Sequence, residues 1–166
     1  APLWSLEGTL LHGQWVSVGD LVPEEPGLEA VLSQFHVAGA PVTLATAGGA
    51  VRWQYQDWQP ETMLTRACVA DFDGDGTLSI VVGEQAPYRM LDVPPRRYDV
   101  TVLDPSGGLV AKLPFTDAKR HDWYYNGENM AQVADVDGDG RDEYVFPTMD
   151  GRVLLIGSPE GRRAWR

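Results

Sequence analysis

The sequence predicts an all-β protein made of about three similar units, each a four-stranded antiparallel sheet, with one extra strand at the N-terminus. Two acidic segments that share one sequence pattern, 69–82 and 133–146, support this prediction. A strand–turn–strand pattern that recurs at 42–53, 100–112 and 153–165 supports it as well. Each unit is therefore strand, acidic loop, strand, connection and hairpin in about 50 residues, the size of a β-propeller blade.

The blades are expected at approximately 13–58, 66–115 and 129–166, within a single segment that spans 1–166. Leu3–Glu7 is expected to form the extra N-terminal strand. Three blades are too few for a ring, since propellers usually have about four to eight. We therefore expect a partial propeller, or one that is completed when chains associate through their terminal edge strands.

The two acidic loops have aspartates at alternating positions, and glycines between and after them allow tight turns. Carboxylates this close repel one another unless a cation lies between them, and Ca²⁺ takes six to eight oxygen ligands. An EF-hand would need a glutamate at the twelfth loop position, where this chain has Val82 and Phe146. The residues after each loop are β-branched or aromatic, which favours a strand over the exiting helix of an EF-hand.

Two calcium sites are therefore predicted. The first has the side chains of Asp71, Asp73, Asp75 and Ser79 and the carbonyl of Thr77. The second has the side chains of Asp135, Asp137, Asp139 and Glu143 and the carbonyl of Arg141. The first site is expected to bind calcium more weakly, because a serine replaces the last carboxylate.

A third, degenerate loop begins at Asp20, where Val22 replaces the second aspartate and two prolines stiffen the chain. We do not expect this loop to hold a metal ion. Asp20 and Glu29 are expected to cap turns instead.

The composition is that of a globular, turn-rich chain: 43% of residues are hydrophobic, and 18 glycines and 12 prolines are present among 166 residues. The formal net charge of -11 argues against nucleic-acid binding, which needs basic patches. The single cysteine, Cys68, excludes an internal disulfide and is expected to be a buried apolar residue. No apolar run approaches the roughly 18 residues that span a bilayer. Calcium can stabilise a secreted fold in place of disulfides, so we expect an extracellular location.

The acidic loops resemble the calcium loops of FG-GAP and VCBS-type repeats, which occur in integrin alpha propellers and in many secreted bacterial proteins. The degenerate loop 18–29 resembles a variant blade start of the rhamnogalacturonan lyases of polysaccharide lyase family eleven. That second resemblance implies a calcium-rich propeller and, as an alternative function, a fragment of a pectin lyase that acts by calcium-assisted β-elimination. The integrin resemblance implies a weaker third idea, an adhesion role.

The sequence identifies no catalytic residue. A lyase would need a base near the bound sugar acid, and His121, Arg120 and Lys119 are the candidates. Aromatic and polar side chains that suit sugar stacking follow at His121, Trp123, Tyr124, Tyr125 and Asn126, although packing between blades is the favoured explanation for Trp123 and Tyr125. Arg89, Arg96 and Arg97 are candidates for binding an anionic sugar.

The function expected first is therefore a calcium-stabilised extracellular module with a binding or self-assembly role. Its expected partner is a polysaccharide, a protein or a second chain. Enzymatic activity is not expected, with the lyase fragment kept as the alternative.

Overall fold

The fold is all-β, with three antiparallel sheets, in a computed structural model that describes residues 4–6, 13–34, 39–56, 63–85, 98–115, 132–147 and 153–157. Eleven strands lie in these ranges. The sheets contain four, four and three strands, and each is a simple meander in which consecutive strands are neighbours. This confirms the predicted fold class of propeller-like blades.

Blade 1 consists of β1 (Gly13–Gly19), β2 (Glu29–Gln34), β3 (Val42–Ala45) and β4 (Val51–Tyr55). Blade 2 consists of β5 (Met63–Ala70), β6 (Ser79–Gln85), β7 (Tyr98–Leu103) and β8 (Leu109–Phe115). The last hairpins of the two blades close with the same bonds. The N–H of Thr46 donates to the Ala50 carbonyl, and that of Asp104 donates to the Gly108 carbonyl, both at 2.9 Å. The hairpins predicted at 42–53 and 100–112 are therefore confirmed, and most of the third, at 153–165, lies outside the described residues.

Blade 3 consists of β9 (Gln132–Ala134), β10 (Glu143–Pro147) and β11 (Val153–Ile156). The fourth strand expected for this blade falls after residue 157, outside the described residues. Of the extra N-terminal strand, only 4–6 are described, and they form no strand. Trp4 nevertheless lies on blade 1, because its Nε1–H donates to the carbonyl of Ala47 at 3.0 Å.

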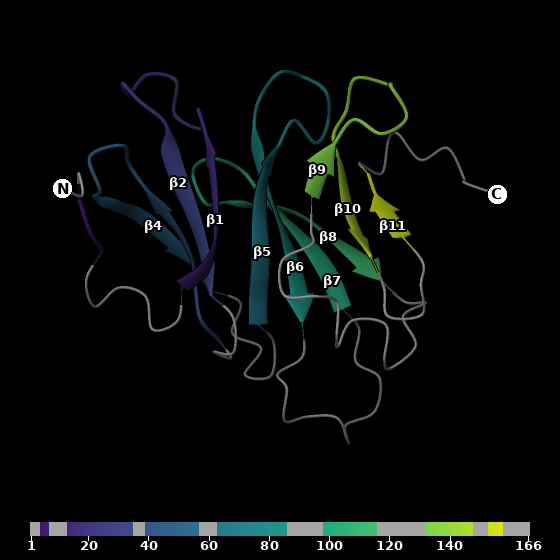
Figure 1. The fold of residues 1–166 in the computed structure, drawn as a ribbon, viewed down its shortest axis with the longest axis horizontal. Coiled ribbons are helices and arrows are strands. Elements are labelled where there is room, and N and C mark those ends of the chain that lie inside the picture. The colour runs from purple at the N-terminus through teal and green to yellow at the C-terminus, as the bar shows by residue number, and fades with distance from the viewer. Residues whose placement is uncertain are drawn as a thin grey trace.

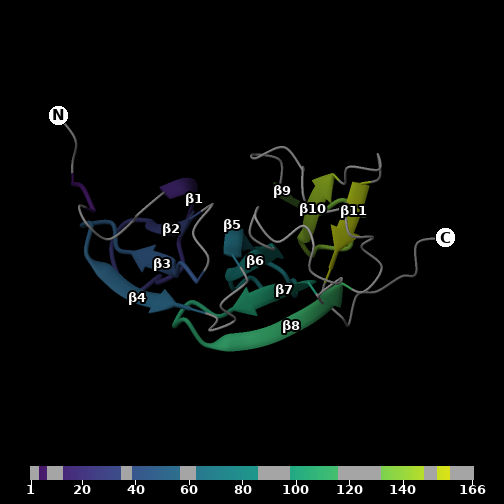
Figure 2. The ribbon, with the colours of Figure 1, turned by 90° about the horizontal axis from the view of Figure 1, so that it is seen from below.

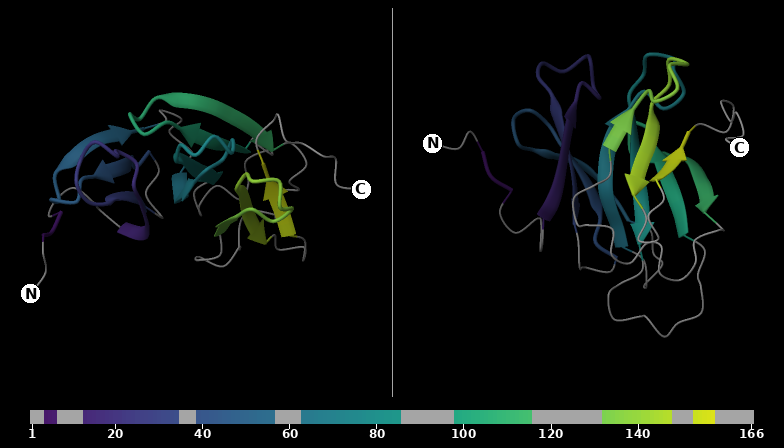
Figure 3. Two further views of the ribbon diagram at one scale, coloured as in Figure 1. Left: turned by 90° about the horizontal axis from the view of Figure 1, so that it is seen from above. Right: turned by 45° about the vertical axis from the view of Figure 1, so that its right-hand side comes forward.

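The blades pack face to face in an arc, with β1, β5 and β9 on the concave side and β4 and β8 on the convex side (Figure 2). The same arc is visible from the opposite end in the left panel of Figure 3. β5 contacts blade 1 through β1, β2 and β3, and it contacts blade 3 through β9. The middle blade is therefore covered on both faces, whereas among the described residues each outer blade has one face without a neighbouring blade.

Two hydrophobic cores fill the junctions between blades. Val31 and Leu44 of blade 1 meet Ile80 and Leu103 of blade 2 in the first core. Side chains in a strand alternate between the two faces, so the neighbouring residues of blade 2 face blade 3. These residues form the second core together with blade 3; its main members are Phe72, Val81, Val102, Tyr144 and Ile156.

The three loops singled out in the sequence lie at the same end of the molecule. The β1–β2, β5–β6 and β9–β10 connections stand side by side at the top of Figure 1. The first strands of the three blades, β1, β5 and β9, run in the same direction. The connection from the first to the second strand therefore lies at the same end of every blade. Within the described ranges, no helix has the length and apolar character needed to cross a membrane.

Candidate metal centres

The β5–β6 loop is folded around the carboxylate of Asp71. The N–H groups of Gly74 and Gly76 donate to Asp71 Oδ1 and Oδ2 at 2.9 and 3.1 Å. Both glycines have positive φ, 76° and 85°, a conformation that residues with a Cβ rarely adopt. The first aspartate therefore organises the backbone and leaves the next two, Asp73 and Asp75, projecting into the same small space.

The β9–β10 loop repeats this construction around Asp135. Its two oxygens accept hydrogen bonds from the N–H groups of Gly138, Asp139 and Gly140, at 2.7, 3.1 and 3.0 Å. Gly138 and Gly140 have φ values of 77° and 87°, close to those of the first loop. Two separate stretches of chain thus reach the same backbone geometry from the same sequence pattern.

Each loop gathers three carboxylates. One ligand oxygen each from Asp71, Asp73 and Asp75 lies within 4.8 Å of the others. A second group with the same spacing is formed by Asp135, Asp137 and Glu143. Two negative charges at this separation repel by about 1 kcal/mol in water and by more where water is excluded. Both groups therefore favour a bound cation, and these two acidic triads can hold ions.

Glu143 is the buried carboxylate of the second triad. It is buried at the start of β10, and burial raises its pKa. The hydrogen bond that its Oε2 accepts from the N–H of Val136, at 2.9 Å, lowers the pKa, and repulsion from the three loop aspartates raises it again. The net pKa is above the ordinary value, which is the response of a carboxylate that lacks a compensating positive charge.

The first loop differs from the second in the direction of its pKa shift. Hydrogen bonds from Thr77, above all from its backbone N–H, lower the pKa of the fully exposed Asp75. Ser79 begins β6 at the position where Glu143 begins β10, so the first loop has no buried carboxylate of this kind.

The structure brings together six of the predicted ligands. The oxygens of Asp139 lie outside the second group, and Asp139 Oδ1 accepts a hydrogen bond from the N–H of Arg141 at 3.0 Å. Ligation by Asp139, by Ser79 and by the carbonyls of Thr77 and Arg141 stays a prediction.

The candidate sugar-binding and lyase residues cannot be placed. Lys119, Arg120, His121, Trp123, Tyr124, Tyr125 and Asn126 lie outside the described residues, as do Arg89, Arg96 and Arg97. The lyase hypothesis therefore stays a prediction from the sequence.

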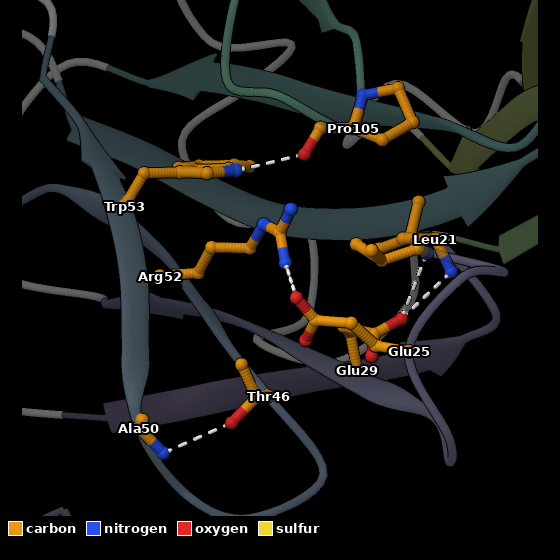
Figure 4. A network of polar contacts seen from close by, with 9 residues as sticks. Leu21, Glu25, Glu29, Thr46, Ala50, Arg52, Trp53 and Pro105 are labelled. Carbon is orange, nitrogen blue, oxygen red and sulfur yellow. Dashed lines mark hydrogen bonds and ion pairs between the residues drawn. The ribbon is translucent and has the colours of Figure 1, made fainter.

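In the degenerate loop of blade 1, a buried carboxylate caps the turn. The Oε2 of the buried Glu29 accepts hydrogen bonds from the N–H groups of Leu21 and Val22, both at 3.0 Å, as Figure 4 shows. The turn-capping role expected for Glu29 is thereby confirmed, whereas Asp20 is exposed. Glu25 in the same loop forms an ion pair with Arg52 of β4. Glu29 is the first residue of β2, as Glu143 is the first residue of β10. The sequence did not reveal this equivalence, because the loop of blade 1 is longer than the other two.

The two acidic loops also contact each other. The N–H of Asp71 donates to Asp142 Oδ2 at 2.8 Å, and the N–H of Asp142 donates to the Asp71 carbonyl at 2.9 Å. Gly74 lies so close to Arg141 that an added Cβ would be 2.7 Å from its Cγ. Asp142 was not predicted to matter, and no local pattern reveals it, since Leu78 holds the matching position in the first loop.

No protein-family model matches this chain. No curated protein matches it significantly in sequence. Among solved structures, the chain is similar to the crystal structure of the exotype rhamnogalacturonan lyase YesX, with a TM-score of 0.37 and 14% sequence identity. That match covers 92% of this chain and 35% of the other, so the chain spans about a third of the length of the lyase. The similarity is thus a distant one, and the loops are interpreted from their own geometry.

Proposed function

We propose that this chain is a calcium-stabilised extracellular propeller module with a binding or self-assembly role. The observation that carries the proposal is that the same acidic loop occurs twice, in blades 2 and 3. Each copy places one oxygen from each of three carboxylates within 4.8 Å of the others. A single acidic turn occurs often without an ion. Two copies with matching hydrogen bonds and matching glycine conformations are better explained by a common ligand.

Calcium fits these loops better than the other common divalent ions. Every side-chain donor in the two triads is a carboxylate oxygen, which excludes the soft, sulfur-rich sites that zinc prefers. Magnesium demands a near-ideal octahedron and keeps several waters, whereas calcium accepts six to eight oxygens in irregular geometry. An ion held by such a loop would join the first two strands of a blade.

The test is thermal unfolding in excess calcium and in excess chelator, with calorimetric titration to count sites. At roughly 100 times its dissociation constant, each ion stabilises the fold by about 2.7 kcal/mol. For a chain of this length, that is a rise in Tm of roughly 5–11 °C per site. Two sites are expected by titration.

Three variants locate the effect. Glu143→Gln removes the buried carboxylate whose pKa is raised. It should therefore raise the Tm in chelator and reduce the rise in Tm that calcium causes. Asp73→Asn should reduce the gain without raising the Tm in chelator as much. Asp104→Asn, which alters an acidic turn outside both triads, is the control and should leave the calcium gain unchanged. A Tm that is the same in calcium and in chelator would overturn the proposal.

A further inference from the structure

The two blade junctions inside this chain are built alike, and the preceding blade contributes the same positions to both. At the first junction, Gly19 ends β1 and allows blade 2 to approach: an added Cβ would lie 2.7 Å from Val69 Cγ1 and 3.2 Å from Leu78 Cδ1. Leu21, the second residue of the following loop, is buried in this junction. The contact therefore needs a small residue, then an apolar one, on the preceding blade.

The second junction repeats this scheme one blade later. Ala70 ends β5, and Phe72, the second residue of its loop, is buried in the core that blade 2 shares with blade 3. From blade 3, Tyr144 and Ile156 complete that core, and Asp142 takes the position that Leu78 holds at the first junction. The right panel of Figure 3 shows the loops of blades 2 and 3 lying against each other.

The outer face of blade 1 carries the receiving half of such a junction, and no other blade of the described residues packs against it. Only its β3–β4 turn is contacted there, by Trp4, as Trp53 contacts the β7–β8 turn at the first junction. Val18 holds the position of Val69, and Leu28, just before the second strand, holds that of Leu78. Val18 and Leu28 are each 55% exposed, and Val16 on the same face is 58% exposed. Their counterparts in blade 2, Val69 and Leu78, pack against the core of the first junction.

The outer face of blade 3 carries the other half. Ala134 ends β9, as Gly19 and Ala70 end β1 and β5, and it is exposed. Val136, the second residue of the loop, is 49% exposed, whereas its counterparts in the two internal junctions are buried. Val153 of β11 is 61% exposed on the same face, while its counterpart in blade 2, Val100, is fully buried.

We propose that the outer face of blade 3 docks on the outer face of blade 1 of a second copy of this chain. The proposal rests on the blade module proposed above and names its partner and its contact surface. The support for this contact is that the chain already forms the same kind of junction twice. The contact lies on the faces of the blades. Two copies joined in this way carry six blades, a number within the usual range of about four to eight for a ring. The contact is heterologous, so a closed ring requires that the second junction also forms.

The experiment is size-exclusion chromatography with light scattering, in calcium, on the wild-type chain and on Val18→Glu and Val153→Glu. Each variant puts a charge on one outer face and leaves the opposite face intact. Both positions are exposed, so the variants should fold, which circular dichroism and an unchanged calcium gain in Tm would verify. Val110→Glu, at a valine of β8 that is also 61% exposed but lies on neither outer face, is the control.

The wild type and Val110→Glu should have twice the 18.2 kDa mass of one chain, and each face variant alone should have the mass of a single chain. A mixture of Val18→Glu and Val153→Glu should recover a dimer, because one variant supplies an intact blade 3 face and the other an intact blade 1 face. A wild type that stays at the single-chain mass at all concentrations would overturn the proposal, as would a mixture that fails to recover dimers. If calcium still raises the Tm, either result leaves the proposed calcium module standing. If only the rise in Tm with calcium is lost, only the calcium module is refuted.

Discussion

Replacing Asp142 with alanine tests whether the two acidic loops hold blades 2 and 3 together. The substitution removes the Oδ2 acceptor that lies 2.8 Å from the N–H of Asp71, and it leaves that half-buried N–H without its partner. A hydrogen bond to a charged group contributes about 1.5–3 kcal/mol. The reciprocal bond, from the N–H of Asp142 to the carbonyl of Asp71, is between backbone groups and should persist.

The expected loss of free energy of unfolding corresponds to a fall in Tm of roughly 3–12 °C for a chain of this length. Thermal unfolding in calcium measures the total effect. Hydrogen exchange at the Asp71 amide measures the local one and should accelerate in Asp142→Ala more than exchange in blade 1 does. Asp142→Asn keeps an oxygen acceptor of the same size and should lose well under half as much stability.

The reasoning would be refuted if Asp142→Ala unfolded at the wild-type temperature. It would also be refuted if Asp142→Asn cost as much as the alanine variant, because the effect would then come from charge alone and not from the hydrogen bond between the loops.

Two further predictions concern buried groups. Burial raises the pKa of Cys68 from 9.0 to about 11, so the folded state holds that proton more tightly and the free energy of unfolding should fall as pH rises from 9 towards 11; denaturant titrations at several pH values should show a smaller fall in Cys68→Ala, and an equal fall would contradict the assignment. Glu29→Ala should lower the free energy of unfolding by about 2–4 kcal/mol, since it leaves the buried N–H groups of Leu21 and Val22 unpaired. Glu29→Gln, which keeps an acceptor oxygen, should cost less in the same titration, and equal costs would show that these hydrogen bonds are not the cause.

Local pattern was sufficient to predict the parts of the fold that depend on local chemistry. The alternating aspartates and glycines of the loops at 71 and 135 dictate the turns, because the carboxylate of each first aspartate accepts hydrogen bonds from N–H groups three to five positions ahead. The β-branched runs after the loops form β6 and β10, whose first residues are Ser79 and Glu143. The hairpin turns followed from glycines in the same way.

Contacts between blades could not be predicted, because they join residues that are remote in the sequence and chemically different from one junction to the next. The same loop position is Leu78 at one junction and Asp142 at the other, so no repeat pattern exposes its role. Trp53 of β4 is a similar case: its Nε1–H donates to the carbonyl of Pro105 in the β7–β8 turn at 2.9 Å, as Figure 4 shows. No local pattern points to this contact, because the two residues are 52 positions apart in the sequence.

The structure also connects the metal centres with the packing of blades. Asp71 contributes its carboxylate to the first triad and its backbone N–H and carbonyl to the junction with Asp142. An ion in the first loop would therefore hold in place a residue that blade 3 contacts. The second loop has the equivalent place on the outer face of blade 3, where Asp135 belongs to the triad and its neighbour Val136 is exposed. Binding of an ion there would order the surface on which a further blade would dock, so cation binding and face-to-face association would act on the same few residues.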